Sequence, residues 1–236
     1  MRLTGVGVGP GDPDLVTVKA IKVLEHADVV FVPTTDPHAR GRAERIVSAH
    51  VDAAKMRRLV FALSSDRPSR EQSWDAAGLV LVDALRAGQH AAFATIGDPN
   101  VYSTFTYLAD TVRGMAPEVT ISTVPGITAL QDLAARSGTV LTEGTQTLAL
   151  VPLTAGARHL ATALAQHDTV AVYKGGSDID RVRTLLRDAG RLPEAVFGTH
   201  LGLDGERIGA LPEGGEAPYL STVIVPRPRG DRGAAL

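Results

Sequence analysis

Short apolar runs alternate with segments of helical periodicity through the first half of the chain. The second of these runs, at 27–32, is predicted to end as a strand at Pro33, because proline has no N–H to donate to a neighbouring strand. Alternating strands and helices are typical of a parallel sheet with crossover helices, so we predict an α/β fold for this half. Strands are predicted at 3–8, 27–32, 57–63, 90–96 and 118–124.

The pattern changes after residue 124. The segment 124–138, VPGITALQDLAARSG, predicts a hinge followed by a helix that buries Ile127, Leu130 and Leu133. Beyond it, short apolar runs surround two helical segments and predict a mixed sheet. We therefore predict two domains, an N-terminal one with a parallel sheet at 1–124 and a C-terminal one with a mixed sheet at 125–230, followed by a frayed tail at 231–236.

Composition narrows the class of protein. The 24 basic and 26 acidic residues leave no basic excess, which argues against nucleic acid as a partner. The absence of cysteine excludes disulfides, thiolate metal sites and cysteine nucleophiles. Of the 24 basic residues 20 are arginines, which favours bidentate recognition of carboxylates or phosphates. With no charged leader and no long apolar segment, we expect a cytoplasmic protein that does not associate with membranes.

Two glycine-led turns follow predicted strands, GVGVGPGDPD at 5–14 and GDPNVYST at 97–104. In open α/β sheets, ligands bind outside the carboxyl ends of the strands. The pattern therefore predicts one ligand held by both turns.

The spacing of the glycines excludes two common nucleotide sites. A dinucleotide fingerprint needs a third glycine where this chain has Pro10, Asp12 or Asp14, depending on the register. No phosphate loop with lysine followed by Ser or Thr is present either. Carboxylates at Asp12 and Asp98 suit a cationic or hydroxyl-rich ligand better than phosphate, because they accept hydrogen bonds from ribose hydroxyls and ammonium groups.

Several motifs, in order along the chain, resemble those of the class III, S-adenosylmethionine-dependent tetrapyrrole (corrin/porphyrin) methylases. GxGPGDPxLxTxKA matches 7–20, GDPxxY matches 97–102, VPGITA matches 124–129, and GERI at 205–208 matches a late hairpin. The similarity covers essentially the whole chain. It implies a two-domain fold with a cofactor cleft between the domains, a homodimer, and no protein-bound metal.

The same resemblance implies which residues contact S-adenosylmethionine and, after transfer, S-adenosylhomocysteine. Lys174 departs from the methionine found in some relatives, so a contact through its backbone is expected. The implied contacts are Pro10, Gly97, Asp98, Val101, Thr128, Ala129, Lys174 and Leu201.

Within the family, the segment Tyr102-Ser103-Thr104 and the long loop after the second strand resemble the enzymes that methylate C20 of precorrin-2 or cobalt-factor II in cobalamin biosynthesis. C20 is electron-rich, so catalysis needs mainly positioning, and the three hydroxyls or a substrate carboxylate are the candidates for receiving or relaying the departing proton. The substrate carries many carboxylates, and His38, Arg40, Arg42 and Arg45 are the candidates for binding it.

Other interpretations of these residues stay open. The three arginines also fit an ordinary solvated helix face. A methylase acting at another ring carbon would carry the same cofactor motifs. From a different class of protein, a non-catalytic nucleotide-binding regulatory module would also use a doubly wound domain.

Overall fold

The computed structural model describes residues 1–62, 66–215 and 217–228. The chain divides into two compact units, Met1–Thr128 and Ala129–Leu236, close to the predicted boundary at 124/125. The predicted tail at 231–236 lies outside the described residues.

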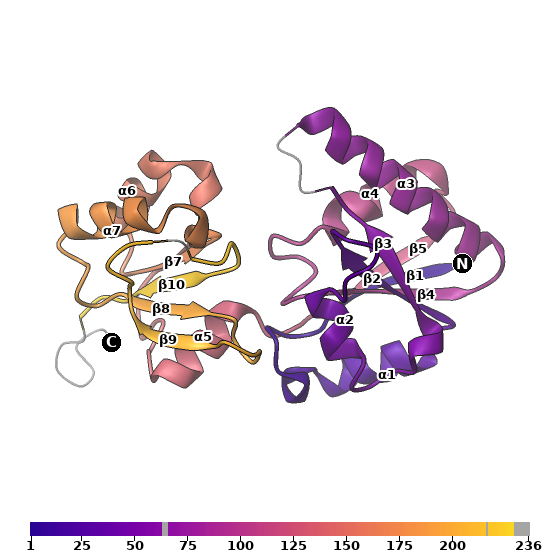
Figure 1. Ribbon diagram of the computed structural model, residues 1–236, viewed down its shortest axis with the longest axis horizontal. Coiled ribbons are helices and arrows are strands. Elements are labelled where there is room, and N and C mark those ends of the chain that lie inside the picture. The colour runs from indigo at the N-terminus through magenta and orange to yellow at the C-terminus, as the bar shows by residue number, and fades with distance from the viewer. Residues whose placement is uncertain (63–65, 216, 229–236) are drawn as a thin grey trace. The chain divides into compact units, whose positions relative to one another are not determined.

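The first unit is built on a five-stranded parallel sheet with the order β3-β2-β4-β1-β5 (Figure 1). Because the strands run in one direction, their carboxyl ends meet at a single edge. The strands are β1 (Arg2–Gly7), β2 (Val29–Thr34), β3 (Met56–Val60), β4 (His90–Thr95) and β5 (Thr120–Val124). The helices are α1 (Val18–His26), α2 (Arg42–Val47), α3 (Arg67–Arg86) and α4 (Phe105–Met115).

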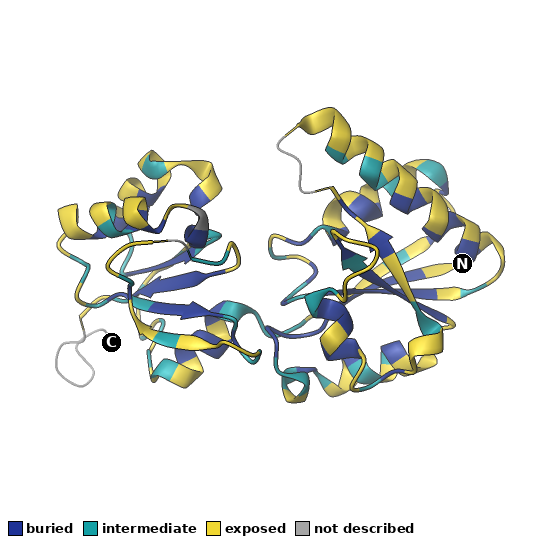
Figure 2. Ribbon diagram, viewed as in Figure 1, coloured by how far each residue is buried: buried dark blue, intermediate teal, exposed yellow. Residues whose placement is uncertain are grey.

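Helices cover both faces of this sheet, which explains why its inner strands β1, β2 and β4 are buried almost throughout, whereas the edge strands β3 and β5 are mostly exposed (Figure 2). One face packs on α1 and α2 through residues such as Val6 and Val30. The opposite face packs on α3 and α4, where the Phe93 ring lies 5.8 Å from that of Phe105. The predicted parallel α/β arrangement is confirmed.

The predicted stop of the second strand at Pro33 is wrong. β2 continues through Pro33, which is in register with Leu59 of β3. The pairing of β2 with β4 ends earlier, at Phe31 opposite Phe93. Thr34 still pairs with β3, because its carbonyl accepts a hydrogen bond from Phe61 N at 2.8 Å. Pro33 therefore falls where the ladder to β4 has already ended and no N–H is needed.

The second unit is built on a five-stranded sheet with the order β6-β7-β10-β8-β9. The sheet is mixed, as predicted. β6 and β7 are parallel, whereas β10 is antiparallel to β7 and to β8. Its elements are α5 (Ala129–Ser137), β6 (Leu148–Pro152), α6 (Ala157–Gln166), β7 (Thr169–Tyr173), α7 (Ile179–Asp188), β8 (Val196–Thr199), β9 (Arg207–Ala210) and β10 (Thr222–Val225).

This sheet is also covered on both faces. α6 and α7 pack on the face that carries Val172 and Phe197, and α5 packs on the face that carries Ala171 and Ile224. Since β7 and β8 both run opposite to β10, their carboxyl ends lie at the same edge of the sheet. Of the helices in the described parts of the chain, none combines the length and apolar character needed to cross a bilayer.

Candidate functional site

Three loops meet at the carboxyl edge of the first unit's sheet. They follow β4, β1 and β5, which are neighbours in the sheet. The loops after β1 and β4 are joined directly, because Gly97 N donates to the Gly9 carbonyl at 2.8 Å and the two residues form an isolated bridge. Both predicted glycine turns thus lie side by side.

The third loop approaches the other two through glycine backbone. A Cβ on Gly7 would lie 2.5 Å from Gly97 O and 2.6 Å from Gly126 N. A Cβ on Gly126 would overlap Gly97 O and lie 2.8 Å from the carbonyl carbon of Gly7. Gly97 itself has φ 68°, which favours glycine. We call the contact of Gly7, Gly97 and Gly126 the glycine junction.

Asp98 ties two of these loops together. One carboxylate oxygen, Oδ2, accepts a hydrogen bond from Gly126 N at 3.0 Å, and the other, Oδ1, accepts one from Asn100 N at 2.8 Å. Two backbone donors thus offset its negative charge, and bonds of this charge-assisted kind are stronger than neutral ones. The carboxylate fixes the loops that surround it.

The remaining cofactor candidates of this unit lie in the same three loops. Pro10 is buried, and Val101 N donates to the Asp98 carbonyl at 3.2 Å. The Cα of Thr128 lies 3.8 Å from the position that a Cβ on Gly97 would take. The structure therefore brings together Pro10, Gly97, Asp98, Val101 and Thr128.

The three hydroxyl candidates after GDP occupy different environments. Tyr102 is 45% exposed and left-handed, with φ 50°, and partial burial raises the pKa of its phenol. Ser103 is buried. Its Oγ lies 2.9 Å from Thr95 Oγ1 and accepts a hydrogen bond from Phe105 N, the first residue of α4. Thr104 is half-buried and directly precedes α4. Ser103 thus stabilises the start of this helix.

The substrate candidates lie on the loop after β2 and on α2. Arg42 is half-buried, and its pKa is lowered by burial and by the positive charge of Arg45. Neither Arg42 nor Arg45 forms an ion pair with any residue that the structure describes. His38 is exposed, and its backbone N donates to Asp36 Oδ1 at 2.8 Å.

An ion pair between a buried carboxylate and an exposed arginine organises this segment, and the sequence did not indicate it. Glu44 is 6% exposed and forms two hydrogen bonds with Arg58, at 2.7 and 2.9 Å. These bonds lower the pKa of Glu44. Arg58 also donates to the Pro37 carbonyl at 2.8 Å, and Arg40 lies 4.0 Å from Glu44. The pair therefore connects β3, α2 and the loop that carries His38.

The second unit's candidates lie at the carboxyl edge of its own sheet. Ala129 and Leu201 pack in one apolar cluster with Tyr173, whose hydroxyl accepts a hydrogen bond from Leu130 N at 3.2 Å. Lys174 follows Tyr173 with left-handed backbone, at φ 58°, and its Nζ lies 5.8 Å from the centre of the Tyr219 ring. Leu201 follows β8 and is buried.

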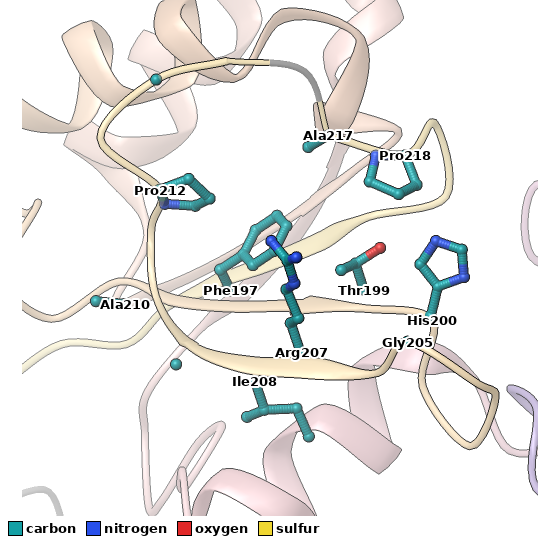
Figure 3. Close-up of a pocket in the computed structure, with 12 residues that line it drawn as sticks. Phe197, Thr199, His200, Gly205, Arg207, Ile208, Ala210, Pro212, Ala217 and Pro218 are labelled. Carbon is teal, nitrogen blue, oxygen red and sulfur yellow. The ribbon is translucent and has the colours of Figure 1, made fainter.

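A pocket of about 420 Å³ opens over the β8–β9 hairpin (Figure 3). Thr199 and Arg207 are directly opposite in register and lie on the same side of the hairpin, with the Phe197 ring beside them. Thr199 Oγ1 is buried, and no hydrogen-bond partner for it is found among the described residues. His200 lies at the end of the pocket near Pro218.

The sequence profile of the tetrapyrrole (corrin/porphyrin) methylases matches residues 2–214. The chain belongs to this family. Among similar members, the cobalt-precorrin-2 C(20)-methyltransferase of Salmonella typhimurium is 30% identical over 229 residues, which is 95% of each chain. The precorrin-2 C(20)-methyltransferase of a Sinorhizobium species is 30% identical over 236 residues, again 95% of each chain.

A solved structure with the same fold is the uroporphyrin-III C-methyl transferase of Thermus thermophilus in complex with S-adenyl homocysteine. It has a TM-score of 0.69 and 23% sequence identity, and the match covers 96% of this chain and 97% of the other. The predicted fold class and family are therefore confirmed.

Sequence reasoning missed several residues that shape these loops. Gly7 and Gly126 belong to the matched motifs, but their spacing gives no hint that they touch each other. Glu44 and Arg58 lie 14 positions apart in charged segments that look solvated. Glu206, whose carboxylate bonds to Gly202 N and to Arg136, lies in the matched GERI motif, and that motif was the sequence feature that could have indicated it.

Proposed function

We propose that this protein is an S-adenosylmethionine-dependent methyltransferase that methylates C20 of precorrin-2, or of its cobalt complex, during cobalamin biosynthesis. The observation that carries the proposal is the 30% identity, over 95% of each chain, to two enzymes named for this reaction. The fold and the loops at the carboxyl edge of the first unit support it.

The loops of the first unit fit such a cofactor. The glycine junction leaves main-chain groups at the edge of the sheet, and S-adenosylmethionine has no phosphate to conflict with Asp98. The Thermus thermophilus enzyme in the comparison is in complex with the corresponding product. Pro10, Gly97, Asp98, Val101 and Thr128 would hold the cofactor from this unit. The assignments of Ala129, Lys174 and Leu201 in the second unit rest on the resemblance.

The cofactor supplies a methyl group that is activated as a sulfonium. The protein's task is to align C20 with that group and to accept a proton after transfer. Alignment alone accounts for a large part of the rate in such displacements, about 7–11 kcal/mol of barrier in favourable cases. Of the three candidate hydroxyls, Ser103 is buried against Thr95 and the start of α4 and Thr104 is half-buried, whereas Tyr102 is 45% exposed and can reach a bound substrate. Burial raises the pKa of this phenol, so Tyr102 would act as a relay: its oxygen takes the proton from C20 while its own proton passes to water or to a substrate carboxylate.

We expect Tyr102→Phe to lower the single-turnover rate by about 100-fold, the lower end of the 10²–10⁴ range of acid–base effects. The affinity for S-adenosylhomocysteine should change little, because only the phenol oxygen is lost. Rapid quench gives the rate and titration calorimetry gives the affinity. A single-turnover rate equal to that of the wild type would remove Tyr102 from the chemistry.

We expect Arg42→Glu to raise the KM for the tetrapyrrole by about tenfold or more, because a half-buried cation becomes a repelling carboxylate, and hydrogen bonds to charged groups are worth about 1.5–3 kcal/mol. The matched control is Arg158→Glu, which makes the same reversal on an exposed residue of α6. Initial rates at varied substrate concentration measure the effect. An unaltered KM in Arg42→Glu would exclude this residue from substrate binding.

We further propose that the enzyme acts in the cytoplasm as a homodimer, without membrane or nucleic-acid partners. The near balance of 24 basic and 26 acidic residues argues against a nucleic-acid partner, and the dimer is what the family resemblance implies. Sedimentation equilibrium on the purified chain should give twice the mass of 24.7 kDa.

The function is tested by titrating the protein with S-adenosylmethionine, S-adenosylhomocysteine and NAD. We expect binding of the first two only. Incubation with precorrin-2 or cobalt-factor II, followed by NMR location of the new methyl group, should then place it on C20. A methyl group on another ring carbon would identify a different methylase of this family, and tight binding of NAD alone would favour a regulatory nucleotide-binding module.

A further inference from the structure

The loop 200–206, between β8 and β9, has an unusually constrained backbone. His200, Gly202 and Gly205 are left-handed, with φ 52°, 68° and 82°. For His200, which has a Cβ, this conformation costs about 1–2 kcal/mol. Two internal bonds shape the loop, from Leu203 N to His200 O at 2.9 Å and from Glu206 N to Leu203 O at 3.1 Å. A loop with this much strain needs further contacts to stay in one conformation.

Glu206 provides those contacts. Its Oε2 accepts a hydrogen bond from Gly202 N at 2.6 Å, which closes the loop from its far end. The two carboxylate oxygens also accept from Arg136 Nη1, at 3.1 and 3.0 Å. Glu206 is therefore connected both to the loop backbone and to α5.

Arg136 is held in place by a second carboxylate, that of Asp132. Its Nε donates at 2.7 Å to Oδ1 of Asp132, a residue of α5 whose side chain is 4% exposed. Leu133, between these two charged residues, packs on Gly198 of β8 and in the same apolar cluster as Leu201. The charged chain Asp132–Arg136–Glu206 thus runs from the buried side of α5 to the amide of Gly202, the residue next to Leu201.

These contacts contribute more to loop geometry than to global stability. A partly exposed ion pair such as Arg136–Glu206 stabilises a fold by about 0.2–1 kcal/mol. If Glu206 is removed, the half-exposed Gly202 amide gains access to water, so no buried donor is stranded. The left-handed backbone at His200 would then lose its restraint and sample other conformations. A ligand that contacts this backbone would have to order the loop on binding.

We propose that Glu206 is a positioning residue for the cofactor, which presets the backbone of His200–Gly202 so that Leu201 can contact S-adenosylmethionine. The inference rests on the proposed function and extends it to a residue that touches no reacting group. Arg136 is its partner in this role. Because Glu206 orders the loop before the cofactor binds, removing its carboxylate should lower the affinity for the cofactor and leave the rate of the chemical step unchanged.

The test compares Glu206→Ala, Glu206→Gln and wild type in the full-length protein. S-adenosylhomocysteine is the probe in titration calorimetry, and kcat is measured at saturating S-adenosylmethionine. We expect about tenfold weaker binding for Glu206→Ala and about threefold for Glu206→Gln, which keeps one acceptor oxygen. For both variants we expect a kcat within about twofold of wild type, since preorganisation acts on binding.

Arg227→Ala is the matched control. It removes the ion pair from Arg227 Nη1 to Asp168 Oδ1, 2.6 Å long, beside the amino end of β7 and so at the opposite edge of the same sheet. This variant should bind the probe as wild type does. Amide exchange at Gly202 should be faster in Glu206→Ala than in Arg227→Ala.

The possible results distinguish a failure of the positioning role of Glu206 from a failure of the proposed methyltransferase function. If wild type binds the probe and Glu206→Ala binds it equally well, or if Arg227→Ala is weakened to the same extent, the positioning role is wrong. If kcat falls while affinity is kept, it is also wrong. If wild type itself does not bind S-adenosylhomocysteine, the proposed function fails first, and Glu206 has no cofactor to position.

Discussion

Gly126→Ala should weaken cofactor binding by about 100-fold or more and lower the thermal midpoint by about 6–12 °C. The new methyl group would overlap Gly97 O and lie 2.8 Å from the carbonyl carbon of Gly7. Both are backbone atoms of adjoining loops, so no flexible side chain can move aside. Overpacking of this kind costs about 1–3 kcal/mol or more, and about 3 kcal/mol corresponds to that shift in a chain of this size.

Binding should suffer more than stability in this variant. The loops after β1, β4 and β5 can separate to admit the methyl group, and a displacement of about 1 Å at a positioning site can cost about 10²-fold. Differential scanning calorimetry and titration with S-adenosylhomocysteine measure the two effects.

The matched control is Gly114→Ala in α4, where a Cβ would meet no atom within 4 Å. Alanine is favoured over glycine in a helix by about 0.5–1 kcal/mol, so this variant should be as stable as wild type or slightly more stable. If Gly126→Ala binds cofactor as well as Gly114→Ala does, the glycine junction does not form the site.

Asp98→Asn should weaken cofactor binding by about 10–100-fold. The carboxylate accepts from Gly126 N with one oxygen and from Asn100 N with the other. In asparagine one of these oxygens becomes an NH₂ group, so this hydrogen-bond donor faces the backbone N–H of Gly126 or Asn100, which is also a donor. Losing a hydrogen bond to a charged acceptor costs about 1.5–3 kcal/mol, which gives the expected range. Titration calorimetry with S-adenosylhomocysteine is the measurement.

Asp28→Asn provides the comparison for this second variant. Asp28 Oδ2 accepts a hydrogen bond from His90 N at 2.7 Å, where β2 and β4 begin. It makes the same kind of contact at the opposite edge of the same sheet. We expect a smaller loss of stability in Asp28→Asn, because its one accepting oxygen can be replaced by the amide oxygen, and a loss of affinity in Asp98→Asn alone. Equal affinities would mean that Asp98 serves only the fold.

The types and order of the secondary-structure elements follow closely from local pattern. Apolar runs such as 90–96 and periodic segments such as 157–166 are encoded by neighbouring residues, and β4 and α6 form there. Pro33 shows the limit of this reasoning. Its tolerance within β2 depends on where the pairing with β4 ends, at Phe31, and no local pattern contains that information.

The candidate site also combines features that the local sequence predicts with features that depend on tertiary contacts. The two GDP motifs and VPGITA are visible in the sequence because glycine and proline mark turns after strands. Ser103 also stood out as a hydroxyl in such a motif. Only its contacts with Thr95 and Phe105 N reveal that it stabilises the start of α4.

By itself, the sequence determined the fold class, the family and the segments that carry the ligand site, because each depends on residue types at short spacing. The tertiary structure decided that the loops after β4, β1 and β5 are neighbours, that Gly7, Gly97 and Gly126 touch, and that Asp98 bonds to an amide 28 residues away. It also decided that Glu44 pairs with Arg58 and Glu206 with Arg136. The physical reason is that strand order and helix packing bring distant residues together, and such contacts leave no periodic trace in the chain.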